Sequence, residues 1–145
     1  MRLEPLCTFE WSYDESVRLP PPGYDLISPY GSDEGIGYGE GRGRASGRIA
    51  GRCVWSNYPR RRSDGRMLPN VRGLITTDDG ASILFELHGR TVFEDEPGRQ
   101  NLVGWLEAAD ERYRWLNDVV CIAEGRIDDA GMHIRAYVGV HELEV

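Results

Sequence analysis

The chain has 145 residues, of which 40% are hydrophobic and 28% are charged, and its formal net charge is −7. These values predict one globular domain that is large enough to bury a core. The negative charge argues against nucleic acid and anionic membrane surfaces as partners, and no apolar run is long enough to span a bilayer.

The cysteines and the N-terminal residues bear on the cellular compartment. Cys7, Cys53 and Cys121 are odd in number, widely spaced and without a Cys-x-x-Cys pair. This pattern favours reduced, buried thiols over a disulfide framework. The segment MRLEPLCTFEW lacks the apolar run of a secretory signal. We therefore expect a cytoplasmic protein.

The N-terminal part of the chain predicts a strand, a loop and a glycine-rich strand. Residues 1–13 read as a strand, and the prolines of residues 14–34 predict a loop that could act as a flap over one end of the fold. In residues 35–45, glycine occupies every second position from Gly35 to Gly43. Because alternate side chains of a strand lie on opposite faces, one face of this strand is bare backbone. Such a face allows tight coiling or close approach of another group, which indicates a small barrel with a hollow in it.

Further short strands follow, separated by turns rich in glycine and aspartate. Asp78-Asp79-Gly80 and Pro97-Gly98 are such turns, and a helical apolar stripe is missing, although residues 102–116 could contain a short helical turn. The pattern predicts an all-β protein, a closed antiparallel β-barrel of roughly eight to ten strands, calycin-like, in a single domain over residues 1–145. The remaining strands are expected at residues 48–56, 70–77, 81–90, 101–108, 112–125 and 131–144.

Alternation around the Asp78-Asp79-Gly80 turn predicts which side chains point inward. In residues 81–90, apolar and charged side chains alternate, so Glu86 and His88 should face water. On the strand before the turn, we expect Asn70 and Arg72 on the inward face. Polar groups there need partners, which are either structural groups or a ligand. The complete inward set expected for this hairpin is Asn70, Arg72, Leu74, Thr76, Ile83, Phe85 and Leu87.

Residues 112–124 give a second inward face. Tyr113, Trp115 and Asn117 should alternate inward, with small apolar residues following them. Two aromatic rings and an amide could form a pocket wall. The alternative is an aromatic core in which Asn117 bonds to a loop backbone. On other strands, Trp55 is expected inside, Asn57 at a rim, and Trp105 in a wall or in the core.

Other site chemistries find little support in the sequence. His88, His133 and His141 lie on different segments without metal-binding spacing, so no metal site is expected. The glycine run precedes no helix, which argues against a phosphate-binding loop. The cluster Arg60-Arg61-Arg62, joined by Arg66, is either a solvated loop or a holder for an anionic substrate tail at the barrel mouth.

The stretch from Tyr38 to Arg90, with its TDDGA turn, and the later RYRWLN segment resemble the bacterial domain-of-unknown-function family number 3237. The resemblance extends from the N-terminal LEPL to the last strand. It implies a small antiparallel β-barrel, in a family whose biochemical role is not generally defined. Members usually carry Asp-x-Arg or Asp-x-His before this turn, where this chain has Asn70-Val71-Arg72. Because an amide does not titrate, Asn70 cannot act as a general base, and the resemblance carries over no proton-abstraction mechanism.

Three functions remain open. The first is a cofactor-free enzyme of isomerase, lyase or cyclase type, in which Arg72 binds a carboxylate or oxyanion while Tyr113 and Asn117 donate hydrogen bonds to an enolate or alkoxide. The second is a non-catalytic carrier of a small aromatic or carbonyl metabolite, and the third is a structural barrel whose outer face builds an oligomer. We expect a small-molecule ligand and a homo-oligomer, without cofactor, metal, nucleic acid or membrane. The expected ligand-binding residues are Trp55, Asn57, Asn70, Trp105 and Trp115.

Overall fold

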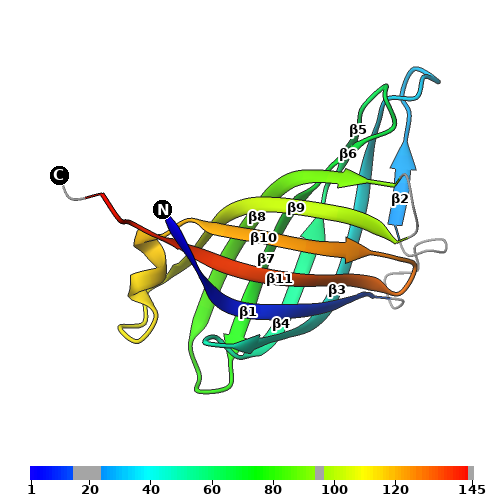
Figure 1. Ribbon diagram of the computed structural model, residues 1–145. Coiled ribbons are helices and arrows are strands. Elements are labelled where there is room, and N and C mark those ends of the chain that lie inside the picture. Colours follow the sequence, from blue (N-terminus) through cyan, green and yellow to red (C-terminus); the bar gives the residue numbers. More distant parts are fainter. Residues whose placement is uncertain (15–23, 94–96, 144–145) are drawn as a thin grey trace.

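The computed structural model describes residues 1–14, 24–93 and 97–143, and these residues form strands, turns and one short 3₁₀-helix, η2 (Figure 1). The elements are β1 (Arg2–Tyr13), β2 (Tyr24–Ile27), β3 (Gly35–Gly47), β4 (Gly51–Asn57), β5 (Arg60–Arg61), β6 (Met67–Leu68), β7 (Asn70–Thr77), β8 (Ser82–Val92), β9 (Gly98–Ala108), η2 (Arg114–Asp118), β10 (Cys121–Ile127) and β11 (Gly131–Val140).

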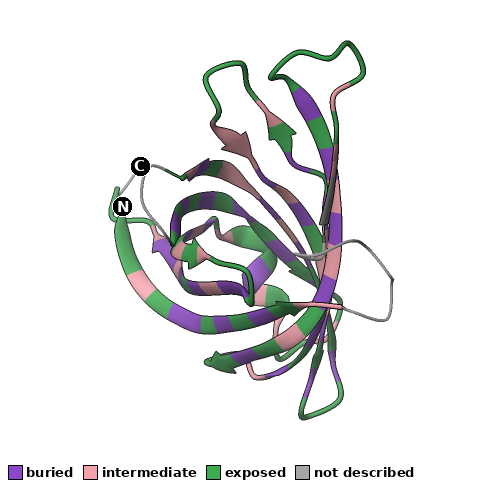
Figure 2. Cartoon of the chain, turned by 90° about the vertical axis from the view of Figure 1, so that its right-hand side faces the viewer, coloured by how far each residue is buried: buried purple, intermediate pink, exposed green. Residues whose placement is uncertain are grey.

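Eight of these strands close a barrel. Each pairs antiparallel with both neighbours in the order β1, β11, β10, β9, β8, β7, β4, β3 and back to β1. Figure 2 looks toward one end of the ring and shows buried and exposed residues alternating along the strands. This alternation is expected when one face of every strand points into a closed barrel. The prediction of a closed antiparallel barrel is therefore confirmed.

Three short strands extend the barrel at one end, which we call the mouth. β5 and β6 form a hairpin that pairs with β3 on one side and with β8 on the other, and β2 also pairs with β3. These strands rise beyond the barrel wall at the right of Figure 1. The loop expected over residues 14–34 is wrong for Tyr24–Ile27, which form β2. Residues 15–23, which belong to the expected flap, lie outside the described residues.

The glycine-rich strand β3 turns its bare face inward. A Cβ atom on Gly41 would overlap the carbonyl oxygen of Ser12 on β1 and lie 2.5 Å from the Trp55 ring. A Cβ on Gly43 would lie 2.8 Å from the side chain of Trp11. The bare face therefore allows close approach, as predicted, but two indole rings fill the space beside it instead of a hollow.

An aromatic cluster fills the middle of the barrel. The ring centroid of Trp11 lies 4.8 Å from that of Phe9, 5.3 Å from that of Phe85 and 5.8 Å from that of Trp55. Tyr13, nearer the mouth, meets Trp55 edge-on at 5.6 Å. Such tilted, stacked and edge-on contacts are favourable, and the rings of Phe9, Trp11, Trp55 and Phe85 are buried. Below the cluster, toward the end opposite the mouth, the core is mainly aliphatic.

The end opposite the mouth is closed by η2. Leu116 of this helix is fully buried, and the Arg48 guanidinium lies 4.3 Å from the ring centroid of Trp115. The single strand expected over residues 112–125 is wrong, because η2 occupies Arg114–Asp118 and β10 begins at Cys121. Among the described residues, no helix has the length and apolar character needed to cross a membrane.

Gly41→Ala should destabilise the protein by roughly 2–3 kcal/mol, since the methyl group would press on the β1 backbone and on the Trp55 ring. Ser46→Ala is the matched control, because it places the same residue on the exposed face of the same strand. Urea unfolding followed by tryptophan fluorescence measures both. Equal midpoints for the two variants would contradict the close approach at Gly41.

Candidate functional site

A cavity of about 500 Å³ opens at the mouth of the barrel. Its wall combines inward-facing residues near the ends of β1, β4, β8, β9 and β10 with the turn that follows β10. This volume is in the range that holds small-molecule ligands. Much of the wall is apolar, with contributions from Leu26, Pro59, Met67, Phe93 and Ile127.

Two buried polar side chains face each other across the β8–β9 pair in this cavity. Thr91 and Gln100 are direct register partners, and Gln100 Nε2 donates to Thr91 Oγ1 at 3.2 Å. Gln100 is only 2% exposed, and its Oε1 has no hydrogen-bond partner among the described residues. Turning the amide over would pair its oxygen with the Thr91 hydroxyl but leave the NH₂ group unpaired instead. A buried polar group left unpaired costs roughly 1–3 kcal/mol, which a complementary ligand would offset.

Asn57 adds a third neutral polar group at the rim, where it was expected. Its Oδ1 accepts a hydrogen bond of 2.9 Å from the backbone N–H of Asn70, which fixes the orientation of the amide. The Nδ2 group has no acceptor among the described residues and belongs to a side chain that lines the cavity. Asn57, Thr91 and Gln100 therefore offer donors and an acceptor without a formal charge.

The charged groups near the mouth lie at its rim. Arg61 lines the cavity, but its guanidinium donates to Asp33 O and, at 3.1 Å, to Ser28 Oγ. Arg62 pairs with Asp64 at 2.8 Å, so much of the basic cluster noted in the sequence is engaged locally. Asp129, in the turn after β10, is exposed and lines the opening. Charge is thus available at the entrance, while the deeper wall is neutral.

Arg72 points outward, and its expected inward orientation is wrong. The β7–β8 register places Arg72 opposite Glu86, and Arg72 Nη2 lies 3.2 Å from Glu86 Oε1 on the outer wall. Asn70 is in the same outward register, opposite His88. Glu86 and His88 do face the outside, as predicted, and their side chains contact each other at 2.8 Å.

The error at Arg72 comes from the turn between β7 and β8. Thr76 pairs with Ser82, so these two side chains share a face. The Thr77 backbone N–H donates to Ala81 O, and the Ala81 N–H donates to Thr77 Oγ1. The sequence pattern had instead placed Thr76 on the same face as Ile83. A slip of one residue moves every side chain of a strand to the other face. The inward residues of β7 are therefore Val71, Gly73, Ile75 and Thr77.

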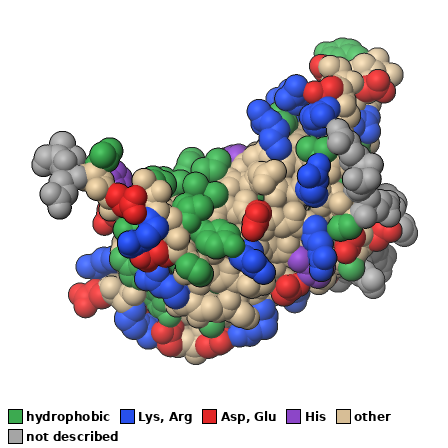
Figure 3. Space-filling model, viewed as in Figure 1, with side chains coloured by type: hydrophobic (Ala, Val, Ile, Leu, Met, Phe, Trp, Pro, Cys, Tyr) green, Lys and Arg blue, Asp and Glu red, His purple; other side chains and the backbone are tan. Residues whose placement is uncertain are grey.

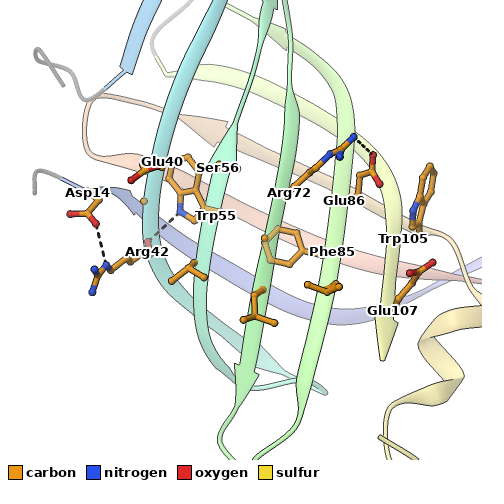
Figure 4. A pocket seen from close by; sticks show the side chains of 15 residues that line it. Asp14, Glu40, Arg42, Trp55, Ser56, Arg72, Phe85, Glu86, Trp105 and Glu107 are labelled. Atoms are coloured by element: carbon orange, nitrogen blue, oxygen red, sulfur yellow. Dashed lines mark hydrogen bonds and ion pairs between the residues drawn. The ribbon is translucent and has the colours of Figure 1, made fainter. Parts of the chain in front are cut away.

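Arg72 and Trp105 instead line a groove of about 600 Å³ on the outer wall (Figure 4). Trp105 projects outward from β9 with 47% of its surface exposed, so its expected place in an inner wall or the core is wrong. Trp55 points inward, as predicted, and donates from Nε1 to Arg42 O at 3.4 Å. The geometry thus separates residues that the sequence had grouped around one hollow.

Tyr113, Trp115 and Asn117 lie at the closed end, remote from the mouth, and the shared pocket wall expected for them is wrong. Asn117 accepts from the Ala108 backbone N–H at 2.8 Å and donates to its carbonyl oxygen at 2.9 Å. Trp115 packs under Arg48. The alternative interpretation, an amide bonded to local backbone beside packed rings, describes these residues.

Tyr113 is part of a hydrogen-bond network that fastens the β7–β8 turn to the segment before η2. Thr77 Oγ1 and Tyr113 Oη each donate to the Asp79 carboxylate at 2.6 Å. These two bonds lower the pKa of Asp79, and the Asp79 carboxylate in turn raises the pKa of Tyr113. Hydrogen bonds from Arg112 lower the pKa of Asp110 to about 2.

The three thiols are buried within the barrel. Burial raises the pKa of Cys121 to about 12 and also raises the pKa values of Cys7 and Cys53, so their reactive thiolate forms are scarce near neutral pH. Among the described residues, no three His, Cys, Asp or Glu side chains gather where they could hold a metal ion.

Sequence reasoning missed Thr91 and Gln100. The expected strands ended at residue 90 and began at residue 101, whereas β8 continues to Val92 and β9 starts at Gly98. Extending the alternation of β9 backwards from Leu102 would have placed Gln100 inward as a polar residue in an apolar series. That signal was present, but the pairing of Gln100 with Thr91 depends on the register between two strands.

Residues 1–138 match a family described as proteins of unknown function (DUF3237), in agreement with the resemblance noted in the sequence. A β-barrel-like protein from Acinetobacter baumannii is 19% identical, with 94% of each chain covered and a TM-score of 0.79. A protein of unknown function from Clostridium acetobutylicum is 16% identical, with 94% of this chain and 97% of that chain covered and a TM-score of 0.82. An enzyme from Penicillium herquei is 19% identical, with coverage of 95% and 94% and a TM-score of 0.68. No curated protein matches the chain.

Tyr113→Phe should reduce stability most between about pH 5 and pH 9. The lowered pKa of Asp79 stabilises the fold above the ordinary carboxylate pKa, and this contribution is lost as the pH falls through the folded value. The raised pKa of Tyr113 stabilises the fold below the ordinary tyrosine pKa and is lost as the pH rises through its folded value. Thermal unfolding across this range checks the prediction, with Tyr137→Phe, on β11, as the control. A difference from wild type that stays constant down to pH 2 would contradict it.

Proposed function

The chain belongs to the DUF3237 family, and we propose that its barrel binds an uncharged small molecule with an aromatic or carbonyl-containing body in the cavity at the mouth. The observation that carries the proposal is the unpaired amide end of Gln100, which is buried in the cavity wall. A site with an apolar wall and a few directed polar groups is the usual form of a small-molecule site.

The residues that line the cavity favour an uncharged ligand. The buried polar residues of the described chain are Asn57, Thr77, Thr91 and Gln100, and none of these is ionisable. An ionised ligand group at the depth of Gln100 would lose its hydration without gaining an opposite charge, which is strongly unfavourable. A hydroxyl or carbonyl group can instead exchange hydrogen bonds with Gln100, Thr91 and Asn57.

The apolar side of the cavity supports an aromatic or otherwise flat body. Phe93, Met67 and Ile127 lie around the opening, and Tyr13 lies between the cavity and the aromatic cluster. Rings and thioethers of this kind favour contact with planar apolar groups. The packed cluster beneath Tyr13 also limits how deep a ligand can enter, so we expect the ligand to remain at the mouth end of the barrel.

Gln100→Leu should lower the affinity for such ligands at least about tenfold, while the stability of the empty protein stays equal or rises, since an unpaired buried amide is removed. Asn101→Leu is the control, because residue 101 is the exposed neighbour on the same strand. Thermal shift and calorimetry with uncharged phenols and aromatic ketones, each matched with a carboxylated analogue, measure binding.

Two results would contradict the proposal. One is preferential binding of the carboxylated analogues by the wild-type protein. The other is a Gln100→Leu variant that binds the neutral compounds as well as the Asn101→Leu control does.

Catalysis in the same cavity is a second candidate, since one similar structure is described as an enzyme. Arg72, Tyr113 and Asn117 cannot act together, because Arg72 is on the outer wall and the other two are at the closed end. Asp129 is an exposed carboxylate at the cavity entrance. In this second proposal, Asp129 exchanges a proton with the bound ligand in an isomerase, lyase or cyclase reaction.

If the cavity turns over a ligand, Asp129→Asn should reduce kcat at least about 100-fold while the Kd changes little. The matched control is Asp64→Asn, a carboxylate in the β5–β6 turn that does not line the cavity. Product analysis by mass spectrometry follows incubation with each compound that binds. Recovery of every bound compound unchanged from the wild-type protein would favour a carrier over an enzyme.

A further inference from the structure

Asn57 differs from Gln100 in the mouth cavity, because the fold fixes which end of its amide faces the ligand space. The backbone N–H of Asn70 lies 2.9 Å from Asn57 Oδ1. A backbone N–H can only donate, so the amide oxygen, and not the NH₂ group, must face it. With the Asn57 amide turned over, two donors would meet at this distance and both would lose a partner. The amide of Gln100, whose neighbour is a hydroxyl group, carries no such constraint.

Backbone pairing holds Asn57 and Asn70 in place. The Tyr58 backbone N–H donates to the Asn70 carbonyl oxygen at 3.1 Å, one residue along the chain from Asn57. Asn57 is also the register partner of Val71 on β7 and of Gly39 on β3. Strands on both sides therefore hold the residue, and its NH₂ group is positioned before a ligand arrives. Such preorganisation reduces the cost of binding.

The NH₂ group of Asn57 is available to a ligand. The side chain faces inward with the residue 9% exposed, and it lines the cavity. Nδ2 has no acceptor among the described residues, yet it is not one of their fully buried polar atoms without a partner. Nδ2 therefore keeps accessible surface, which opens on the cavity. Gly39, beside Asn57 on β3, also lines the cavity and places no side chain next to the amide.

The charged groups around the opening do not duplicate this donor. Figure 3 shows charged side chains of both signs over the raised part of the fold that carries β5 and β6. Arg61 lines the cavity, but its guanidinium donates to Asp33 O and Ser28 Oγ. An ionised Asp129 accepts hydrogen bonds and cannot donate them. Asn57 therefore supplies an uncharged donor with a fixed direction.

We propose that Asn57 selects ligands that present a carbonyl oxygen to β4, such as aromatic ketones, quinones or lactones. Because these ligands would occupy the cavity of the proposed function, the inference rests on that function and narrows its ligand class. A carbonyl oxygen accepts but does not donate, so it pairs with the Nδ2 hydrogens, whereas an N–H group at the same position would face another donor. Sites that hydrogen-bond a ligand group discriminate strongly against analogues that lack it. Gln100 can present either end of its amide, so this selection lies with Asn57.

Three uncharged compounds with the same fused-ring frame test the selection. 1-Indanone carries a carbonyl group, indoline an N–H group and indane a CH₂ group at the same ring position. In calorimetric titrations of the wild-type protein, the dissociation constant of 1-indanone should lie about fivefold or more below those of indoline and indane.

Asn57→Asp should abolish this order. Aspartate keeps an oxygen for the Asn70 N–H but replaces the NH₂ group with an acceptor, so the preference for 1-indanone over indoline should disappear or reverse. Asn101→Asp is the matched control, since it makes the same change on the exposed face of β9 and should keep the wild-type order.

Asn70→Pro tests the same point without an added charge. It removes the N–H that fixes the Asn57 amide, at the first residue of β7, where proline is tolerated in a strand. The freed amide can turn over, so the preference for 1-indanone over indoline should fall below about twofold. Thermal unfolding verifies that each variant is folded.

The possible results distinguish the role of Asn57 from the proposed function. A wild-type protein that binds neither these three compounds nor the phenols and ketones used above would overturn both. Binding of the phenols alone, or equal dissociation constants for the three compounds, would overturn the role of Asn57 and leave the cavity as a ligand site. An order that Asn57→Asp and Asn70→Pro leave unchanged would do the same.

Discussion

The closure of this barrel depends on the absence of side chains at Gly41 and Gly43. At these positions two β1 carbonyl oxygens, of Ser12 and Glu10, and two tryptophan side chains occupy the volume that a Cβ atom would need. Strand β3 can therefore pair with β1 and β4 while Trp11 and Trp55 lie against its inner face. A side chain there would displace either the neighbouring backbone or the aromatic cluster, and densely packed interiors tolerate neither well.

The aromatic cluster divides the interior into two parts with different chemistry. On the closed side, η2 inserts Leu116 into an aliphatic core, and polar side chains such as Asn117 are used to tie backbone segments together. On the mouth side, the wall retains a cavity and an amide end that the protein itself does not pair. Buried polar groups are normally satisfied. Of the three buried polar atoms without a partner among the described residues, Trp11 Nε1, Asn70 Oδ1 and Gln100 Oε1, only the last belongs to a residue that lines this cavity, so it is the strongest indication of a ligand.

The inner and outer faces of the same strands carry separate roles. On β8, Phe85 supports the aromatic cluster from inside, while Leu84 and Glu86 face the groove on the outside. A strand alternates its side chains between faces, so each residue of β8 contributes to only one of these surfaces. This separation keeps the cavity at the mouth independent of the groove on the outer wall. Substitutions on the outer face of β8 should therefore change the cavity little.

The fold class and part of the interior could be predicted from the amino-acid pattern. Alternating glycines and Asp/Gly turns reflect local backbone geometry, which is visible in the sequence. They allowed the prediction of the closed antiparallel barrel, the bare face of β3, the inward Trp55, and the outward Glu86 and His88. The outward placement of Arg72 could not be predicted, because it depends on how the β7–β8 turn closes. A shift of one residue there moves every side chain of the strand to the opposite face. The distance of Tyr113 and Asn117 from the mouth, and the contact of Gln100 with Thr91 there, could be seen only in the folded chain. Contacts between strands distant in sequence are fixed by barrel closure and register, which local patterns do not contain.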